Sequence, residues 1–370
     1  MRIGISAPYD LSKAGGVNTL IRAQATALRR RGHDVCVFGA SSAPARDGEV
    51  SLGSCISIVI GNTETGFGID PRSYWTSKRL LRQRMFDVIH MHEPLMPLPS
   101  WFVLRHADVP VVASFHTFRT EGHRWYPKFQ RFFAGLMKRV SVRLAISEVA
   151  KQTVAAHFPG DYEIIPAAID VGRFSTPAPR PATMPADRRS VLYVGRIEPR
   201  KGVERLIRAM PQVQARVPGV QLVIVGGGPD REAIESLARE LDVRAIFAGR
   251  VADEKLPAYY QSADVVCSPA LGDESFGITL LEAMAAGRPI VASDIAGYAE
   301  LLTPTGSARL ARVGDVDELA RELCTVLTDS SLAHAMGARG SAAARQYDWN
   351  VIAERLIEIY DAVLRTSDNV

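Results

Sequence analysis

Two glutamates with seven residues between them, Glu274 and Glu282, border the start of a predicted helix. Ser275 and Gly277 indicate a loop whose backbone N–H groups point outward at the beginning of that helix. A helix N-terminus carries partial positive charge and can hold a diphosphate, while the two carboxylates could bind a sugar and a ribose. As isolated residues, the glutamates are also explained by a solvated loop and a solvated helix face.

The segments around these glutamates alternate between short apolar strands and helices. The expected strands span residues 2–7, 34–39, 86–92, 109–115, 143–147, 162–165, 191–195, 221–226, 245–247, 264–268 and 289–293. The expected helices span residues 17–31, 202–217, 231–241, 280–286, 315–327, 330–345 and 349–365. This rhythm predicts an α/β chain with two doubly wound, Rossmann-like domains facing each other across a cleft, and ligands beyond the carboxyl ends of the strands.

A proline-rich stretch divides the two predicted domains. Residues 175–190 contain repeated prolines without apolar periodicity, which is typical of a linker. We therefore expect a first, acceptor-binding domain over 1–174 and a second, donor-binding domain over 191–348. A helix at about 349–370 is expected to pack back on the first domain.

Residues 274–289, Glu-Ser-Phe-Gly-Ile-Thr-Leu-Leu-Glu-Ala-Met-Ala-Ala-Gly-Arg-Pro, resemble the E-x7-E signature of the retaining family-4 glycosyltransferases of GT-B fold. The stretch 193–202 resembles the strand, Gly-Arg and Lys-Gly element of that family, and 224–229 resembles its second-domain glycine turn. Gly15-Gly16-Val17 matches the glycine loop of the first domain, so the resemblance spans essentially the whole chain.

The resemblance implies that the substrate is a nucleotide diphosphate sugar. Arg196 and Lys201 would stabilise the charge that grows on the departing phosphate, and Gly16 would let backbone N–H approach it. The donor-binding residues would be Gly16, Gly195, Arg250, Val251, Ser275, Phe276, Gly277, Ile278, Thr279 and Glu282.

A histidine, His116, follows an apolar strand of the first domain. In the family a histidine here contacts the donor sugar, whereas a lone histidine is more often a buried, hydrogen-bonded one. The expected catalytic residues are thus His116, Arg196, Lys201 and Glu274. The resemblance implies no enzymic nucleophile: the acceptor hydroxyl attacks on the face that the diphosphate leaves, and a phosphate oxygen takes its proton. We expect no cofactor and no metal requirement, because no Asp-x-Asp pair lies near a strand end, and Asp315 and Asp317 suit a helix cap.

The segments Pro8-Tyr9, 87–94 and 115–117 look like those of the phosphatidylinositol mannosyltransferases. That likeness implies transfer of mannose from GDP-mannose to the inositol of a membrane lipid. The implied acceptor-binding residues are Tyr9, Asn18 and Thr117, with Arg72 or Lys78 near the lipid phosphate. The chain departs from the family pattern at 166–170, Pro-Ala-Ala-Ile-Asp, and has Asn18 where a glutamine is expected.

The formal net charge of +4 hides an asymmetry between the two halves. Residues 1–185 hold 23 Lys and Arg against 14 Asp and Glu, a net +9, and the remainder is −5. Basic and aromatic residues mix at 72–84 and 119–139, which indicates either a peripheral membrane contact or solvated helix faces with packed aromatics. The excess suits a phosphate-bearing lipid surface better than nucleic acid.

Other classes are disfavoured by composition. No apolar run reaches the ~18–20 residues of a membrane helix, no signal peptide is evident, and four distant cysteines form no CxxC pair. We expect a cytoplasmic protein, peripheral at the inner face of the plasma membrane. Two alternatives stay open: a UDP-sugar transferase acting on a soluble polyol, inositol phosphate, malate or diacylglycerol, and a non-catalytic sugar-nucleotide or anionic-lipid binder. A dinucleotide oxidoreductase is disfavoured because 226–231 lacks the third glycine of G-x-G-x-x-G.

Overall fold

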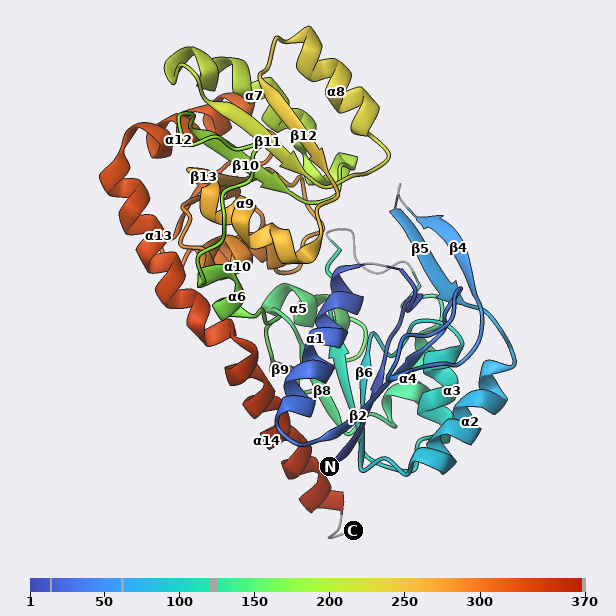
Figure 1. Cartoon of the computed structure of the whole chain (residues 1–370). Helices are drawn as coiled ribbons and strands as arrows, with labels where there is room; N and C mark the ends of the chain where they lie inside the picture. Colours follow the sequence, from blue (N-terminus) through green and yellow to red (C-terminus); the bar gives the residue numbers. More distant parts are fainter. Residues whose placement is uncertain (14, 61–62, 120–124, 368–370) are drawn as a thin grey trace. The chain divides into compact units, whose positions relative to one another are not determined.

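The computed structural model describes residues 1–13, 15–60, 63–119 and 125–367, which form two compact units (Figure 1). The first unit comprises Met1–Ala168 and Trp349–Val370, and the second comprises Ile169–Asp348. The chain leaves the first unit after Ala168, earlier than the expected boundary at residue 174. The proline-rich stretch 175–190 belongs to the second unit because it packs there: Met184 is fully buried and Ala178 N donates to Gln261 Oε1 at 2.9 Å.

The first unit is built on a seven-stranded parallel sheet of order β3-β2-β1-β6-β7-β8-β9. Its strands are β1 (Arg2–Ser6), β2 (Asp34–Gly39), β3 (Glu49–Ser51), β6 (Val88–His92), β7 (Val111–Phe115), β8 (Val142–Ala145) and β9 (Glu163–Ile164). Its helices are α1 (Gly16–Arg30), α2 (Ser73–Arg84), α3 (Pro99–His106), α4 (Gln130–Met137), α5 (Glu148–Ala155) and α14 (Trp349–Ser367). An antiparallel pair, β4 (Cys55–Ile60) and β5 (Thr63–Gly68), was not anticipated from the sequence.

The second unit contains a six-stranded parallel sheet of order β12-β11-β10-β13-β14-β15. Its strands are β10 (Ser190–Val194), β11 (Gln221–Val225), β12 (Ala245–Gly249), β13 (Val265–Ser268), β14 (Ile290–Ser293) and β15 (Ala308–Ala311). Its α-helices are α6 (Val171–Ser175), α7 (Val203–Arg216), α8 (Arg231–Glu240), α9 (Leu256–Ser262), α10 (Ile278–Ala285), α11 (Ala296–Leu302), α12 (Val316–Thr328) and α13 (Ser330–Ala344). Short 3₁₀ turns span Pro199–Lys201, Asp253–Lys255 and Arg345–Tyr347.

Apolar strands and amphipathic helices account for both cores. Every residue of β6, β7, β11 and β13 is buried, as expected for parallel strands covered on two faces. Helix α7 buries its apolar face (Leu206, Ile207, Met210) in the core of the second unit. Asp315 Oδ1 accepts from Glu318 N at 2.9 Å and caps α12, the role expected for this aspartate. The two Rossmann-like domains of the expected α/β class are therefore confirmed.

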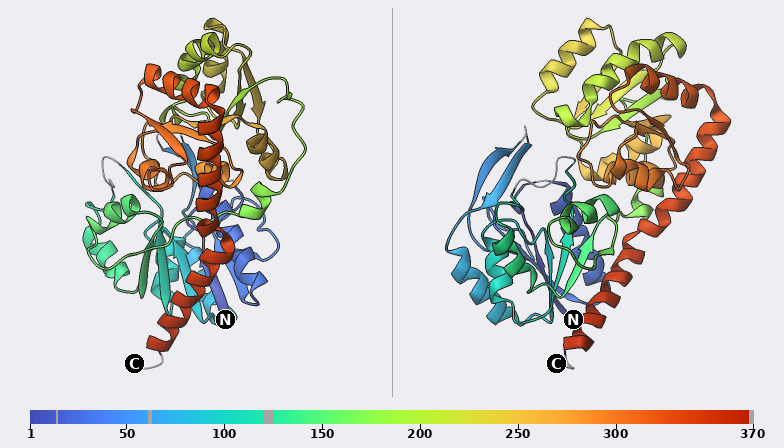
Figure 2. Two further views of the ribbon diagram at one scale, coloured as in Figure 1. Left: turned by 90° about the vertical axis from the view of Figure 1, so that its left-hand side faces the viewer. Right: turned by 180° about the vertical axis from the view of Figure 1, so that it is seen from behind.

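The last helix, α14, belongs to the first unit and packs against α1 (Figure 2). Its Tyr360 is fully buried, and Glu354 lies 3.7 Å from the guanidinium of Arg31 on the turn after α1. Within the described residues, none of the helices combines the length and apolar character needed to cross a membrane.

Candidate active site

In each sheet the strand order reverses once, and the residues of interest follow the strands at or next to that reversal. In the second unit the chain runs from β10 to β12 on one side and then continues from β13 on the other. The loops after β10 and β13 therefore leave the same edge of the sheet side by side. Such a switch point is where open α/β sheets bind ligands. It brings the end of the stretch 193–202 beside the start of the stretch 274–289, and both stretches were singled out from the sequence.

The β10 and β13 loops are joined by a chain of ion pairs. Lys201 Nζ lies 2.7 Å from Glu274 Oε1, and Arg200 also pairs with that oxygen. Arg200 Nε in turn lies 2.7 Å from Glu198 Oε1, and Arg196 Nε lies 3.3 Å from Glu198 Oε2. The Glu198 side chain is only 1% exposed, whereas the three cations are 20–45% exposed. Three cations are thus fixed at the edge of the sheet by two carboxylates, which suits a ligand with two negative phosphates.

Two glycines allow the backbone of this edge to pack closely. Gly202 has φ +67°, and a Cβ there would lie 1.9 Å from the carbonyl oxygen of Pro269 in the β13 loop. A Cβ on Gly297 would lie 2.0 Å from the carbonyl oxygen of Glu274. Neither position can take a side chain without moving the backbone. The placement of Glu274 beside Lys201 therefore depends on these contacts.

The second glutamate, Glu282, lies inside α10 and is half-buried. Burial raises the pKa of its carboxyl to about 7, although Tyr260 donates a hydrogen bond to Glu282 Oε2 at 2.7 Å and Arg173 lies nearby, and both favour the charged form. Gly277, with φ +93°, precedes the helix, and no side chain caps it. The α10 N-terminus therefore keeps its backbone N–H groups available for an anion.

The remaining expected donor residues divide between surface and interior. Ser275, Ile278 and Thr279 are half-buried around the start of α10. Arg250 is exposed, and its side chain lies 3.8 Å from where a Cβ of Gly227 would be. Phe276 is buried, with its ring 5.8 Å from that of Tyr347, so this ring supports the turn from inside. Gly195 and Val251 are half-buried, and Gly195 has φ +157° with a Cβ position only 2.9 Å from the Tyr193 hydroxyl.

In the first unit, the corresponding reversal lies between β1 and β6, and His116 follows the next strand, β7. His116 Nε2 is 2.7 Å from Nδ1 of His92, the last residue of β6. Glu93 Oε1 accepts hydrogen bonds from His116 N at 2.7 Å, Thr117 N at 2.7 Å and Thr117 Oγ1 at 2.8 Å. Two consecutive residues at the end of β6, His92 and Glu93, therefore hold two consecutive residues after β7.

Burial controls the protonation of this group. It lowers the pKa of His116 to about 4 and that of His90 to about 3, and it lowers the pKa of His92 as well. At neutral pH the three imidazoles are therefore uncharged. Burial also raises the pKa of Glu93, and burial together with the charge of Glu93 raises the pKa of Tyr9. Thr117 therefore donates to the Glu93 carboxylate, and the charge of that carboxylate also acts on Tyr9.

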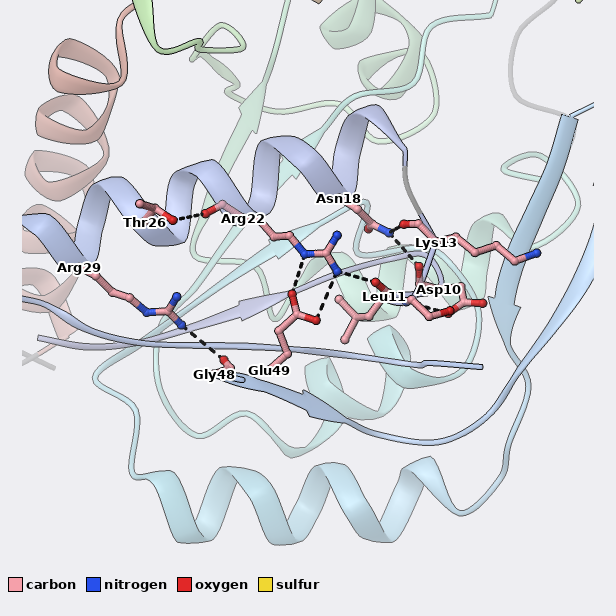
Figure 3. Close-up of polar contacts among 10 residues, drawn as sticks. Asp10, Leu11, Lys13, Asn18, Arg22, Thr26, Arg29, Gly48 and Glu49 are labelled. Carbon is pink, nitrogen blue, oxygen red and sulfur yellow. Dashed lines mark hydrogen bonds and ion pairs between the residues drawn. The ribbon is translucent and has the colours of Figure 1, made fainter. Parts of the chain in front are cut away.

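The glycine loop before α1 is braced by side chains of that helix (Figure 3). Asn18 Nδ2 donates to Asp10 O at 2.8 Å and to Lys13 O at 3.0 Å. Arg22 donates to Leu11 O and pairs with Glu49 at 2.7 Å. Asn18 is buried and its amide nitrogen is occupied by the loop, so it holds the loop rather than offering that nitrogen to an acceptor. Its carboxamide oxygen has no hydrogen-bond partner among the described residues, so the acceptor contact that the resemblance implied stays a prediction.

Gly16 is exposed at the first residue of α1, and a Cβ there would meet nothing within 4 Å. The two basic acceptor candidates lie elsewhere in the unit. Arg72 is exposed just before α2, and Lys78 Nζ lies 5.8 Å from the centre of the Trp75 ring. In the described part of the chain, neither makes a hydrogen bond or ion pair with Tyr9, Asn18 or Thr117.

Sequence reasoning missed four residues that build these sites: His92 and Glu93 in the first unit, and Glu198 and Arg200 in the second. Glu198 and Arg200 lie within two residues of Arg196 or Lys201 in the chain. His92 and Glu93 lie at the end of the strand that pairs with the one before His116. Their position at a strand end was a usable signal, because the carboxyl ends of adjacent parallel strands share one edge.

Comparison with known proteins identifies the family and the fold. Residues 14–173 match the family model described as Glycosyltransferase Family 4, and residues 177–343 match Glycosyl transferases group 1. The fold is shared with the sucrose-phosphate synthase of Thermosynechococcus elongatus (TM-score 0.80, 22% identity, 99% of this chain and 100% of that chain). It is also shared with Anabaena HepE in complex with UDP and glucose (TM-score 0.78, 20% identity, 98% and 100%). Fold and family models together define a two-domain glycosyltransferase.

Curated relatives cover the chain from end to end. A protein of Mycolicibacterium smegmatis is 35% identical over 98% of this chain and 94% of its own length, and one of Mycobacterium leprae is 36% identical over 100% and 99%. A protein of Propionibacterium freudenreichii is 30% identical over 97% and 94%. All three are named phosphatidyl-myo-inositol mannosyltransferase. The chain belongs to the family 4 glycosyltransferases, and the resemblance seen in the sequence is confirmed.

Proposed function

We propose that this chain is a retaining mannosyltransferase that moves mannose from GDP-mannose to the inositol of a phosphatidylinositol lipid. The observation that carries the proposal is the full-length identity of 35–36% to relatives named for that reaction. The cation cluster at the β10–β13 switch point supports it, because a sugar nucleotide brings a diphosphate to that place.

In this reaction the second unit binds the donor and stabilises its leaving group. The bond between the anomeric carbon and the β-phosphate oxygen breaks, so negative charge grows on that phosphate. Arg196 and Lys201 stabilise this charge, the first with a planar fork and the second as a point charge. Glu274 binds hydroxyls of the sugar, and Glu282 binds the ribose.

The acceptor hydroxyl attacks the anomeric carbon from the face that the diphosphate is leaving. The new glycosidic bond therefore forms with retained configuration. The hydroxyl proton passes to an oxygen of the departing phosphate, so no side chain is needed as nucleophile or base. His116 contacts the sugar as an uncharged imidazole, in keeping with its lowered pKa. Tyr9 and Thr117 line the acceptor site, and Thr117 is held there by its hydrogen bond to Glu93 Oε1.

The donor is proposed to react without a resident metal or cofactor, because Arg196, Arg200 and Lys201 already supply positive charge for a diphosphate. Turnover in the presence of EDTA tests this. Loss of activity on chelation, restored by Mg²⁺ or Mn²⁺, would replace this part of the proposal.

The lipid acceptor requires contact with a bilayer, which we assign to α2 and α4 of the first unit. On α2, Trp75, Arg79 and Arg82 share one exposed face, and Trp75 is 68% exposed. Before and on α4, Trp125 is 58%, Phe129 46% and Phe132 48% exposed, with Lys128 Nζ 5.9 Å from the Trp125 ring centre. Exposed aromatic and basic side chains together suit an anionic membrane surface, here the inner face of the plasma membrane. Arg124, part of the same basic stretch, lies outside the described residues.

A donor and acceptor panel tests the proposal. Purified protein is incubated with GDP-mannose, GDP-glucose, UDP-glucose or UDP-N-acetylglucosamine, with liposomes that contain or lack phosphatidylinositol, and released nucleotide and mannosylated lipid are measured. GDP-mannose turnover that depends on phosphatidylinositol is expected. The second candidate is a transferase that uses a UDP-sugar. A donor other than GDP-mannose is worth testing because the relatives also include a protein of Mycobacterium tuberculosis named glycogen synthase, which is 30% identical over 98% of this chain. Turnover of UDP-sugars alone would favour that candidate, and no turnover of any donor would contradict both.

A further inference from the structure

The bond between His92 and His116 raises the question of which ring carries the shared proton. His92 Nδ1 and His116 Nε2 are 2.7 Å apart, and the two side chains are only 2% and 8% exposed. Burial keeps both rings neutral at pH 7, so each has one N–H and one bare nitrogen. The direction of this bond therefore fixes the tautomer of both histidines.

The surroundings of His92 favour one direction. If His116 Nε2–H were the donor, the proton of His92 would sit on Nε2, and this nitrogen is buried with no hydrogen-bond partner among the described residues. A buried N–H without an acceptor is rarer than a buried acceptor without a donor. His92 Nδ1–H is thus the donor, and the single proton of His116 is placed on Nδ1.

The ring of His92 is backed by a second fixed histidine. The rings of His90 and His92 are stacked, with centroids 4.6 Å apart and planes 8° from parallel. Gln24 Nε2 lies 2.9 Å and the Tyr360 hydroxyl 2.6 Å from His90 Nδ1. Because an amide nitrogen only donates, His90 Nδ1 accepts, and its Nε2–H is left for Ser114 Oγ at 2.7 Å. Hydrogen bonds at both nitrogens therefore fix the His90 ring, against which the His92 ring stacks.

Backbone contacts fix the other half of the arrangement. Glu93 Oε1 accepts from the backbone N–H groups of His116 and Thr117, so the main chain that carries His116 is tied to the residue after His92. The imidazole and the main chain of His116 are thus anchored to consecutive residues of one strand end. This arrangement leaves the Nδ1 side of His116 without a hydrogen bond in the described part of the chain.

We propose that His92 is a positioning residue that keeps His116 in its Nδ1–H form, so that His116 offers a neutral hydrogen-bond donor to an oxygen of the sugar donor. The inference rests on the proposed function for the identity of that ligand. His116 transfers no proton: it keeps the one on Nδ1 throughout, and the acceptor proton leaves with the phosphate. A donor contact that strengthens as charge develops would act on kcat.

Nitrogen NMR tests the tautomer without any substrate. The full-length chain is labelled with ¹⁵N-histidine, and the signals of His116 are assigned by their loss in His116→Gln. A protonated Nδ1 and a bare Nε2 are expected for His116. The opposite assignment, or a ring that exchanges between both forms, overturns the proposal whatever the activity with any sugar nucleotide.

Two substitutions of His92 separate positioning from packing. In His92→Asn an amide N–H can replace Nδ1–H, whereas in His92→Asp a carboxylate of the same shape can only accept. His92→Asn should keep the Nδ1–H form and a kcat within about tenfold of wild type. In His92→Asp, His116 Nε2 should carry a proton, either as the neutral Nε2–H form or as a doubly protonated imidazolium. The value of kcat should fall by about 10²-fold, the scale of one lost transition-state donor.

Melting temperature and circular dichroism show whether each variant folds. If His92→Asp does not fold, His92→Leu replaces it, because leucine removes the bond without burying a charge; mixed tautomers of His116 and a loss of kcat are then expected. Two outcomes contradict the proposal. One is an equal loss of kcat in His92→Asn and in the variant that cannot donate (His92→Asp or His92→Leu). The other is a His116 tautomer that stays unchanged in the variant that cannot donate. If wild type turns over no sugar nucleotide, the proposed function fails while the NMR result still decides the tautomer.

Discussion

The ammonium of Lys201 lies 2.7 Å from the carboxylate of Glu274, with the two side chains 20% and 12% exposed. The loop after β10 and the loop after β13 are thus joined by a charge pair at the edge of one sheet. A sugar nucleotide offers phosphate to the cation and hydroxyls to the carboxylate. The pair therefore holds each side chain near the place where its own ligand group is expected, which limits the reorganisation needed on binding.

Removal of either charge should affect turnover far more than folding. Lys201→Gln and Glu274→Gln are each expected to lower kcat by about 10²–10³-fold, since each removes a contact to the transition state. The free energy of unfolding should change by no more than about 1 kcal/mol, because a partly exposed ion pair contributes little. Steady-state kinetics and urea unfolding measure the two effects. Glu204→Gln, which breaks the exposed Arg208–Glu204 pair at 2.9 Å, is the control and should alter neither.

Two glycines should respond to alanine in opposite ways. Gly202→Ala is expected to destabilise the fold, by about 1 kcal/mol or more, because its φ is +67° and its Cβ would meet Pro269 O at 1.9 Å. Gly16→Ala should leave stability unchanged or slightly raised, because a Cβ there has open space. If Gly16 serves a phosphate, the same variant should raise KM for the donor. A Gly16→Ala enzyme with an unchanged KM would remove this residue from the donor site.

The carboxyl of Glu282 should make stability depend on pH. Its pKa is about 7 in the folded chain, against 4.5 for an unperturbed glutamate, so between these values the folded state binds more protons than the unfolded state. The contribution of this group to stability is therefore full below about pH 4.5 and lost as pH rises through 7. Glu282→Gln, whose amide stays neutral, should gain up to about 3 kcal/mol relative to wild type between pH 5 and pH 8.

Urea unfolding at the two pH values measures this gain. The exposed Glu254 provides a matched control, and Glu254→Gln should show no such difference between pH 5 and pH 8. Equal stability differences between wild type and Glu282→Gln at both pH values would show that Glu282 titrates normally.

Membrane contact should follow the exposed face of α2. Trp75→Ser and the double variant Arg79→Glu/Arg82→Glu are expected to weaken co-sedimentation with anionic liposomes, the first by loss of an interfacial aromatic and the second by repulsion. Binding of wild type should also fall as salt is raised. The double variant Arg239→Glu/Arg244→Glu, at two exposed positions of the second unit, changes the net charge by the same amount and should bind like wild type. Wild-type binding by the double variant would exclude α2 as the contact.

Much of the architecture is encoded locally and was predictable. Strands such as Val111–Phe115 are continuous apolar runs, and helices such as Val203–Arg216 have one apolar face, so each segment reveals its own structure. The β4–β5 pair was not predicted, although β4 (Cys-Ile-Ser-Ile-Val-Ile) is itself an apolar run. Its partner β5 (Thr-Glu-Thr-Gly-Phe-Gly) contains two glycines and a single large apolar residue, so no second strand was evident beside it. The domain boundary was misplaced because the proline-rich stretch 175–190 looks like a linker but packs on the second unit through Ala178 and Met184.

The sequence by itself determined the family, the two α/β domains and the functional candidates Arg196, Lys201, Glu274 and His116, since these lie in short motifs at strand ends. Only the tertiary structure decided what surrounds them. Glu198 and Arg200 link the cations to Glu274, and His92 holds His116, because parallel strands far apart in the chain end side by side at one sheet edge. Such contacts arise from strand order and burial, and no local spacing of residues encodes either of these.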